Sequence, residues 1–590
     1  MITKSIKHTL IACSLCCGAA AALTACNDFL TIYPTDRIVA EDFWKKKSDV
    51  DQMVDGCYLS MINYSVQERA IMWGAFRSDE LVKQADYNDN TLDNISAVNL
   101  LPTNRYNDWS AFYKVINNCN VVLSHAPEVM AEDPEFTEGD YQVVRAQMLA
   151  LRSLCYFYLV RAFRDVPYTT RSYEDDSQVE SLPQSSPSEV LQHCLDDLDE
   201  ARRYIMKSGA YGQDDWRNWG YMTRDAVHAL MADIYLWRAA MSHDGGDYRQ
   251  AIAFCDSVIN AKDAYYKHTH QTDIMDKEED RYHLENGMTA MMTIFNTDGG
   301  NSHESILELQ YNGENNSNSA LAEYYYRVNA NSQNGRLMAS QIFNTVAKNA
   351  NTADAIRLYL TRNDYRFWNN VYDANNEEAE QMSVRKMVER ENTLIDVTSV
   401  AGPRKSTSRD FDKFRQNWIV YRLTDIMLMQ AEALVETAAN DSDEVTLRKA
   451  FNLVQAVNKR SMAKNASDTL KYEEYKSKES MELLVLNERE RELCFEGKRY
   501  FDLMRYCYRH MEGVNIRDRL ADTGAWPELY PPMLKMIIRK YGGGGEGDAV
   551  SYKMKGEPYL YWPVLESEIK VNSLLNQNPV FIQEKSTSKN

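Results

Sequence analysis

The chain is short of positive charge. Its 590 residues hold 66 lysines and arginines against 86 aspartates and glutamates, which gives a formal net charge of −20 at pH 7. Proteins that bind nucleic acids or anionic lipid surfaces need clustered basic side chains to contact phosphates. The acidic balance therefore argues against both functions, and no nucleic-acid partner is expected.

Familiar catalytic and metal-binding motifs are also missing. The sequence contains no HExxH, GxSxG or P-loop pattern, and the cysteines after residue 26 show no CxxC spacing. These motifs mark zinc proteases, serine hydrolases and nucleotide-binding enzymes. We therefore predict no catalytic residue, no metal site and no cofactor, with a structural Ca2+ ion on loop carboxylates as the one alternative in so acidic a chain.

Long hydrophobic runs are confined to the N-terminus. Lys4 and Lys7 precede an uncharged stretch from Leu10 to Leu23, and no later run reaches 18 apolar residues. That stretch is too short to span a bilayer and is typical of a secretory signal. It ends in Leu-Thr-Ala before Cys26, which resembles the lipobox of bacterial lipoproteins. The resemblance implies that residues 1–25 are a signal peptide and that Cys26 carries the lipid anchor, the alternative being an ordinary signal peptide.

An odd number of cysteines remains after the predicted anchor. We expect them to be buried free thiols that pack as small hydrophobic side chains. One or two disulfides are the alternative in an oxidising compartment. The seven residues are Cys57, Cys119, Cys155, Cys194, Cys255, Cys494 and Cys507.

Apolar residues recur at helical spacing through much of the chain. The clearest case is Tyr141–Phe163, which Pro167 follows. Ser186, with proline next and Glu189 three residues on, predicts the start of another helix. Further helices are predicted over 48–61, 108–123, 223–240, 248–259, 422–436, 445–462 and 480–496.

Alanines mark the positions where these helices would touch, as in tetratricopeptide-type hairpins. No strict repeat length is present, so the pairs are degenerate repeats. The predicted fold is mainly α: stacked helical hairpins with long irregular loops and a few short strands. Residues 26–590 would form one domain, whose scaffold covers roughly 41–261 and 415–510 and whose ligand-binding insertions are 262–410 and 511–563.

One charged segment near the C-terminal end is distinctive. Residues 491–505 read RELCFEGKRYFDLMR, with Gly497 suited to end one helix before the next begins. Opposite charges three residues apart share a helix face, so they would brace neighbouring helices. An acid/base pair formed by Glu492 and Glu496 is the catalytic alternative.

This segment resembles the RELAFEGxRxFDLxR signature of the SusD/RagB family of outer-membrane nutrient-binding lipoproteins. Further blocks agree in the same order. They are residues 41–58 at the mature start, 145–167, 421–434, and the ending with Trp562-Pro563 and Asn578-Pro579. Cys494 departs from the family's usual alanine, which is a conservative change.

The resemblance implies a role rather than a reaction. Members of this family sit on the surface of the outer membrane, hold oligosaccharides or polysaccharides, and deliver them to a SusC-like TonB-dependent transporter. In the RagB branch the cargo is peptide. The remaining alternatives are a lipid-anchored glycoside hydrolase, which needs two suitably spaced carboxylates, and a structural helical-repeat adaptor.

A glycan site needs an aromatic platform with short polar side chains beside it. This mixture is expected in loops outside the predicted helices, since the family's ligand residues vary and do not transfer by motif. The candidate ligand-binding residues are Trp73, Arg77, Asp79, Tyr87, Asn104, Tyr106, Tyr324, Tyr325 and Trp368.

Overall fold

The computed structural model describes residues 43–175, 179–270, 281–296, 300–326, 335–344, 358–359, 361–372, 374, 376, 379–388, 414–463, 469–522, 526–542 and 545–581. The predicted signal peptide, Cys26 and much of the insertion 262–410 lie outside the described residues. The division into scaffold and insertions stays a prediction.

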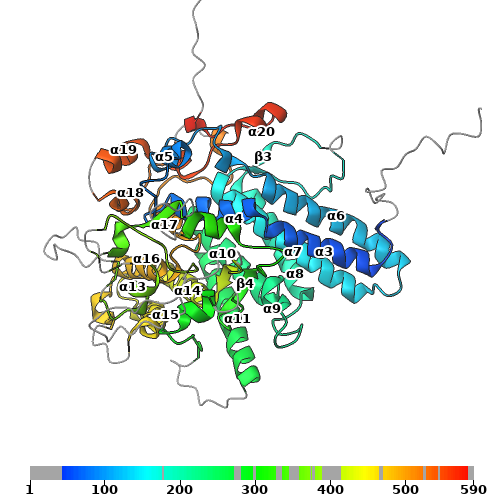
Figure 1. Cartoon of the computed structure of the whole chain (residues 1–590), viewed down its shortest axis with the longest axis horizontal. Coiled ribbons are helices and arrows are strands. Elements are labelled where there is room, and N and C mark those ends of the chain that lie inside the picture. The colour runs from blue at the N-terminus through cyan, green and yellow to red at the C-terminus, as the bar shows by residue number, and fades with distance from the viewer. Residues whose placement is uncertain are drawn as a thin grey trace, which may run out of the picture.

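The described chain is mainly helical, which confirms the predicted fold class. Consecutive long helices pack in pairs, α6 with α7, α7 with α8, α10 with α11, and α14 with α15, and Figure 1 shows α3, α6, α7 and α8 side by side. The long helices are α3 (Lys47–Met61), α6 (Ser110–Glu132), α7 (Glu138–Phe163), α8 (Pro187–Tyr204), α10 (Arg224–Ser242), α11 (Gly245–His270), α14 (Leu423–Thr437), α15 (Glu444–Ser461), α16 (Lys478–Leu493) and α17 (Arg499–Arg509).

Local signals explain most of the helix boundaries. Ser186 caps α8 through a hydrogen bond from the Glu189 amide, as its sequence predicts. Two helices run past their predicted ends. The extension of α6 reaches Glu132 despite an internal proline and still buries Val129, and α11 reaches His270, with Tyr266 stacked on His283. The helix predicted over 480–496 instead ends at Leu493, since Phe495 has a left-handed backbone with φ 66°.

Short strands and helices fill the spaces around the scaffold. β1 (Leu81–Lys83), β5 (Leu337–Ser340) and β6 (Gln381–Met382) form one antiparallel sheet. β2 (Val166–Pro167) pairs with β3 (Gln184–Ser185), and the buried β4 (Ser305–Leu309) pairs with β7 (Trp418–Arg422). The short helices include α4 (Tyr64–Ile71), η1 (Met72–Phe76), α5 (Asn90–Ser96), η2 (Arg105–Asn107), α12 (Ser319–Tyr325), α13 (Tyr365–Asn369), α18 (Pro531–Ile538), α19 (Gly545–Lys553) and α20 (Glu566–Val571).

The helix α7 lies at the centre of the hydrophobic core. By length and composition it could cross a membrane, but 83% of its most apolar window is buried inside the protein, as in a core helix. Cys155 of α7 is buried, as are the other six cysteines after residue 26, and all seven are free thiols. The expectation of buried free thiols is confirmed.

The charged segment 491–505 lies in the interior and forms a buried ion network. Glu492 pairs with Arg422 at 2.7 Å and with Arg366 at 3.0 Å, and Glu496 pairs with Arg422 at 2.8 Å and with Lys386 at 2.6 Å. Arg366 and Lys386 belong to the predicted insertion, whereas Glu492 belongs to α16. The network therefore ties the insertion to the helical scaffold.

The carboxylates of this network are suited to bracing rather than to proton transfer. Burial alone would raise the pKa of Glu492, but Arg460, Arg422 and Arg366 hold it well below its usual value. A general acid needs the opposite shift. The cross-bracing hypothesis for this segment is thus supported over an acid/base pair with Glu496.

The end of α7 anchors the C-terminal part of the chain. Arg164 donates from Nε to the carboxylate of Glu557 at 2.9 Å, and the amide of Leu520 donates to Asp165 Oδ2 at 2.7 Å. The Trp562 amide donates to the carbonyl of Ala162 at 2.9 Å. These bonds join segments about 350 to 400 residues apart in sequence to one helix end.

Two glycines allow η1 to approach the turn between α16 and α17. A Cβ at Gly74 would lie 1.8 Å from the carbonyl oxygen of Gly497, and Gly497 itself has φ +71°. A side chain at Gly74 would therefore collide with backbone, which cannot rotate away.

We expect Gly74→Ala to lower the free energy of unfolding by at least about 2 kcal/mol through this overpacking. Gly56→Ala is the matched control: Gly56 lies inside α3 with nothing within 4 Å of its ideal Cβ, so alanine should be neutral or stabilising. Urea denaturation of both variants measures the difference. Equal stabilities would show that the close approach is absent.

Burial raises the pKa of Asp165 to about 6, although Arg164 partly offsets the shift. The folded state therefore binds more protons at this site than the unfolded state between about pH 4 and 6. The contribution of Asp165 to stability should fall as the pH rises through that window, by up to about 3 kcal/mol. The difference in unfolding free energy between Asp165→Asn and wild type should follow this trend in urea titrations at pH 4, 5, 6 and 7. A pH-independent difference would contradict it.

Candidate ligand-binding site

Four tyrosines from separate elements meet on one side of α4. They are Tyr64 of α4, Tyr87 after β1, Tyr106 of η2 and Tyr324 of α12, and we call them the tyrosine cluster. The antiparallel pairing of β1 with β5 places residue 336 across from residue 84, since the Gln84 amide donates to the carbonyl of residue 336 at 2.9 Å. The sheet thus brings the turn with Tyr87 toward α12.

Hydrogen bonds connect the buried part of the cluster. The hydroxyls of Tyr106 and Tyr324 lie 2.8 Å apart, and Tyr324 donates to the Glu68 carboxylate at 2.5 Å. Both rings are fully buried. Burial raises the pKa of both hydroxyls, so they stay protonated at neutral pH and keep these bonds. The result is a fixed polar wall behind the surface.

Charged side chains form the outer rim of the cluster. Arg105 donates to the Tyr106 hydroxyl at 2.6 Å, while its side chain remains 53% exposed. The Arg336 guanidinium lies over the half-buried Tyr87 ring at 5.1 Å and pairs with Glu323. The rim therefore offers guanidinium donors, a carboxylate acceptor and an aromatic ring to a molecule that approaches from solvent.

The structure brings together five of the nine predicted ligand residues. Tyr87, Tyr106 and Tyr324 belong to the tyrosine cluster itself. The Asn104 side chain accepts from the Tyr106 amide at 2.9 Å, and the Trp73 indole donates to the Tyr106 carbonyl at 2.8 Å. Trp73 and Asn104 are buried, so they position Tyr106 instead of lining the surface.

The other four predicted residues lie apart from this site. Arg77 is buried and donates to the carbonyls of residues 559 and 560. Asp79 is fully buried between Arg499 and Arg539, which hold its pKa below the usual value against the effect of burial. Tyr325 is buried and donates to the Phe495 carbonyl at 3.2 Å, and Trp368 is half-buried and donates to the carbonyl of residue 362 at 2.9 Å. In this conformation only Trp368 of the four offers part of its ring to solvent.

Sequence reasoning missed the rim residues. Arg105 stands between two predicted residues, so its position was available from the sequence. Tyr64 lies three residues after the end of the predicted helix 48–61 and was not among the predicted ligand residues. Glu323 and Arg336 carried no local signal, because only the pairing of β1 with β5 brings them to Tyr87.

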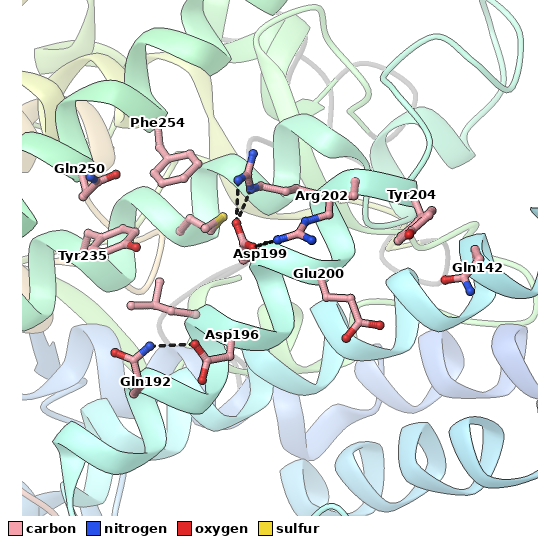
Figure 2. A pocket seen from close by; sticks show the side chains of 13 residues that line it. Gln142, Gln192, Asp196, Asp199, Glu200, Arg202, Tyr204, Tyr235, Gln250 and Phe254 are labelled. Atoms are coloured by element: carbon pink, nitrogen blue, oxygen red, sulfur yellow. Dashed lines mark hydrogen bonds and ion pairs between the residues drawn. The ribbon is translucent and has the colours of Figure 1, made fainter.

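A separate groove of about 700 Å³ lies between α8, α10 and α11. Figure 2 shows Tyr235 and Phe254 on one side and the charged residues of α8 on the other, and the two aromatic rings stack at 5.7 Å. The charges of α8 satisfy one another, since Asp199 pairs with Arg202 at 2.6 Å and also with Arg203. The groove's polar rim is therefore largely self-paired.

The groove shows no sign of hydrolytic chemistry at Asp199. Its hydrogen bond to Arg202 holds the pKa of the Asp199 carboxylate below the usual value. Glycoside hydrolysis needs a carboxylic acid with a raised pKa.

Among the residues that the structure describes, no group of three or more His, Cys, Asp or Glu side chains could hold a metal ion. The Ca2+ alternative stays a prediction.

Two family models match successive parts of the chain. The model described as "SusD family" matches residues 289–581, and the one described as "Starch-binding associating with outer membrane" matches residues 28–236. The tyrosine cluster draws residues from both matched regions.

Solved structures of SusD superfamily proteins share the fold over most of the chain. A protein from Bacteroides vulgatus superposes with a TM-score of 0.63 at 16% identity, covering 91% of this chain and 100% of that one. A second, from Bacteroides thetaiotaomicron, gives 0.59 at 19% identity over 91% and 99%. A structure described as a laminarin-binding SusD-like protein gives 0.56 at 20% identity over 91% and 99%.

Curated relatives match over part of their length. SusD-like protein P38 of Formosa agariphila is 29% identical over 185 residues, which cover 31% of this chain and 35% of the relative. SusD-like protein P2 of the same organism is 25% identical over 247 residues, which cover 40% and 44%. The family models, the relatives and the shared fold agree: the chain belongs to the SusD family.

Proposed function

We propose that the protein binds a glycan at the surface of the outer membrane and delivers it to a SusC-like TonB-dependent transporter. The observation that carries the binding part is the rim of the tyrosine cluster, where Arg105, Tyr87 and Arg336 present donors and a ring to solvent beside buried hydroxyls. The descriptions of the starch-binding family model and of the laminarin-binding structure support a glycan as the ligand.

The chemistry of a sugar suits this rim. A pyranose ring has apolar C–H faces that pack on an aromatic ring, and hydroxyls that bond to guanidinium and carboxylate groups. Tyr87 supplies the ring, Arg105 and Arg336 supply donors, and Glu323 supplies the acceptor. Because the wall of Tyr106 and Tyr324 is fixed by hydrogen bonds, little ordering is needed when the ligand arrives.

The proposed location rests on the lipobox and on the family description. Acyl chains on Cys26 would hold the mature chain at the membrane, since each buried CH2 contributes about 0.8 kcal/mol. A lipid-anchored lid positioned over a transporter raises the local concentration of cargo at the pore. This is binding and transfer without bond cleavage, so the protein would not be an enzyme.

We expect the chain lacking residues 1–26 to bind at least one polysaccharide in a panel of laminarin, soluble starch, xylan and pectin without cleaving it. Binding is measured by affinity gel electrophoresis, and products by chromatography after overnight incubation. New, shorter saccharides would establish the hydrolase alternative. Binding of a casein digest in place of every glycan would establish the peptide-binding alternative.

The tyrosine cluster is tested with Arg105→Ala and Tyr87→Ala. Each change removes a solvent-facing contact and should weaken glycan binding by about 5-fold or more, as expected for losing one charge-assisted hydrogen bond or one ring contact. Arg171→Ala is the matched control, because its side chain is 54% exposed and also forms an ion pair, with Glu180. Unchanged binding by both cluster variants, with control-like melting temperatures, would remove the site from consideration.

The anchor is tested with Cys26→Ala in the full-length protein. We expect this variant to leave the membrane fraction on cell fractionation, because the acylated thiol is absent. Cys13→Ala, within the predicted signal peptide, should remain in that fraction and controls for the loss of a cysteine. Firm membrane attachment of Cys26→Ala would contradict the lipoprotein hypothesis.

A further inference from the structure

A second aromatic surface lies on the loop between α8 and α10. Trp216 directly precedes the short helix α9 (Arg217–Gly220), and 47% of its surface is exposed. Figure 1 places α9 at the outer edge of the helical stack, beside α8. An exposed indole gives up the hydrophobic stabilisation that its burial would provide. The contacts on its buried side must therefore hold the indole in this exposed orientation.

Aromatic neighbours fix the indole from the inner side. Trp216 contacts Tyr221 edge to face at a centroid distance of 5.3 Å, and Tyr221 stacks on Tyr58 of α3 at 4.3 Å. The Tyr58 hydroxyl donates to Gln147 of α7 at 3.0 Å. The indole is thus supported by two helices of the scaffold, although it sits on a loop.

A glycine makes room for the ring. An ideal Cβ at Gly220 would lie 2.7 Å from Cε3 of Trp216 and 2.6 Å from Cγ of Gln310. A larger residue there would push the indole out of its position. The ring therefore rests against backbone on its inner side, and its exposed surface is presented to solvent.

An ion pair borders the indole. Arg217 donates to Asp215 at 2.9 Å from Nε and at 2.6 Å from Nη2, and these side chains are 43% and 23% exposed. The Arg217 guanidinium also lies over the Tyr211 ring at 4.9 Å. Donors, acceptors and two rings are consequently held in fixed positions around one exposed face.

We propose that Trp216, Tyr211, Asp215 and Arg217 form a second glycan-binding platform on the helical scaffold. A pyranose ring would stack on the indole while its hydroxyls bond to the free lone pairs of Asp215 and to the remaining N–H groups of Arg217. The contact area that one indole and one phenol can offer is far smaller than the roughly 800 Å² that each partner buries in a stable protein interface. A saccharide fits this surface better than a protein.

The inference rests on the proposed function for its ligand class and extends it to long chains. Gln310, which borders Gly220, is followed by Tyr311, whose hydroxyl donates to the carbonyl of Ile62 at 3.3 Å. Tyr64 of the tyrosine cluster lies two residues beyond Ile62. These contacts link both platforms to the residues between α3 and α4, so we expect a polysaccharide to contact both where a short oligosaccharide contacts one.

The test uses the full-length chain in mild detergent, with laminarin and soluble starch and their short oligosaccharides as probes. Hydrogen exchange followed by mass spectrometry reports protection of residues 209–221 and of residues 84–107 separately. Trp216→Ala should weaken polysaccharide binding about 3-fold or more and leave binding of short oligosaccharides at the tyrosine cluster unchanged. Trp526→Ala is the matched control, since Trp526 is 38% exposed on another surface element.

Protection of residues 209–221 that persists in Arg105→Ala and disappears in Trp216→Ala supports the second platform, even if the tyrosine cluster binds nothing. Protection of residues 84–107 alone overturns it and leaves the proposed function standing. Failure of every probe to bind wild type overturns both. Arg217→Ala, which keeps the indole, provides the same readout if Trp216→Ala unfolds.

Discussion

The buried pairing of Glu492 and Glu496 with Arg366, Lys386 and Arg422 is the interaction on which the rest of the structure depends. Each charge taken from water costs several kcal/mol, and only its partners repay that cost, so losing one partner typically costs about 3–5 kcal/mol. The network does not follow the hydrophobic pattern of the sequence. Its charge pairs specify that the segments with Arg366 and Lys386 pack against the end of α16. It explains how the described residues of the predicted insertion, Arg366 and Lys386 among them, are held against the helices.

The fold could be predicted from the sequence where local sequence patterns determine the structure. Apolar spacing and the cap at Ser186 predicted α7 and α8 closely, and Gly497 predicted the break between α16 and α17. The extension of α11 to His270 was not predicted, because contacts with a later segment, such as the stacking of Tyr266 on His283 at 4.1 Å, leave no sign in the helix periodicity. Family resemblance supplied the functional class, which composition alone could not.

The candidate site could be predicted from the sequence only in part, because burial and long-range strand pairing are not visible in local patterns. Aromatic and polar residues in loops indicated Tyr87, Tyr106 and Tyr324, but only Tyr87 of these is partly exposed. The same criterion also selected Asp79 and Tyr325, which are buried and lie outside the tyrosine cluster. The residue type shows which contacts a side chain could make with a ligand. Its burial and its hydrogen-bond partners in the folded protein determine whether it can make them. The rim residues Arg336 and Glu323 reach Tyr87 only through the pairing of β1 with β5, which joins segments more than 200 residues apart and which no local pattern encodes.

The seven buried thiols have a practical consequence for labelling the protein. Burial raises the pKa of the Cys155, Cys194 and Cys507 thiols, so their nucleophilic thiolate form is scarce. These cysteines should therefore react slowly with thiol reagents. The seven described cysteines are all free thiols, so no disulfide holds this part of the chain together. A single cysteine engineered on the surface would then be the one reactive thiol of the described chain, and a fluorophore attached there could report ligand binding.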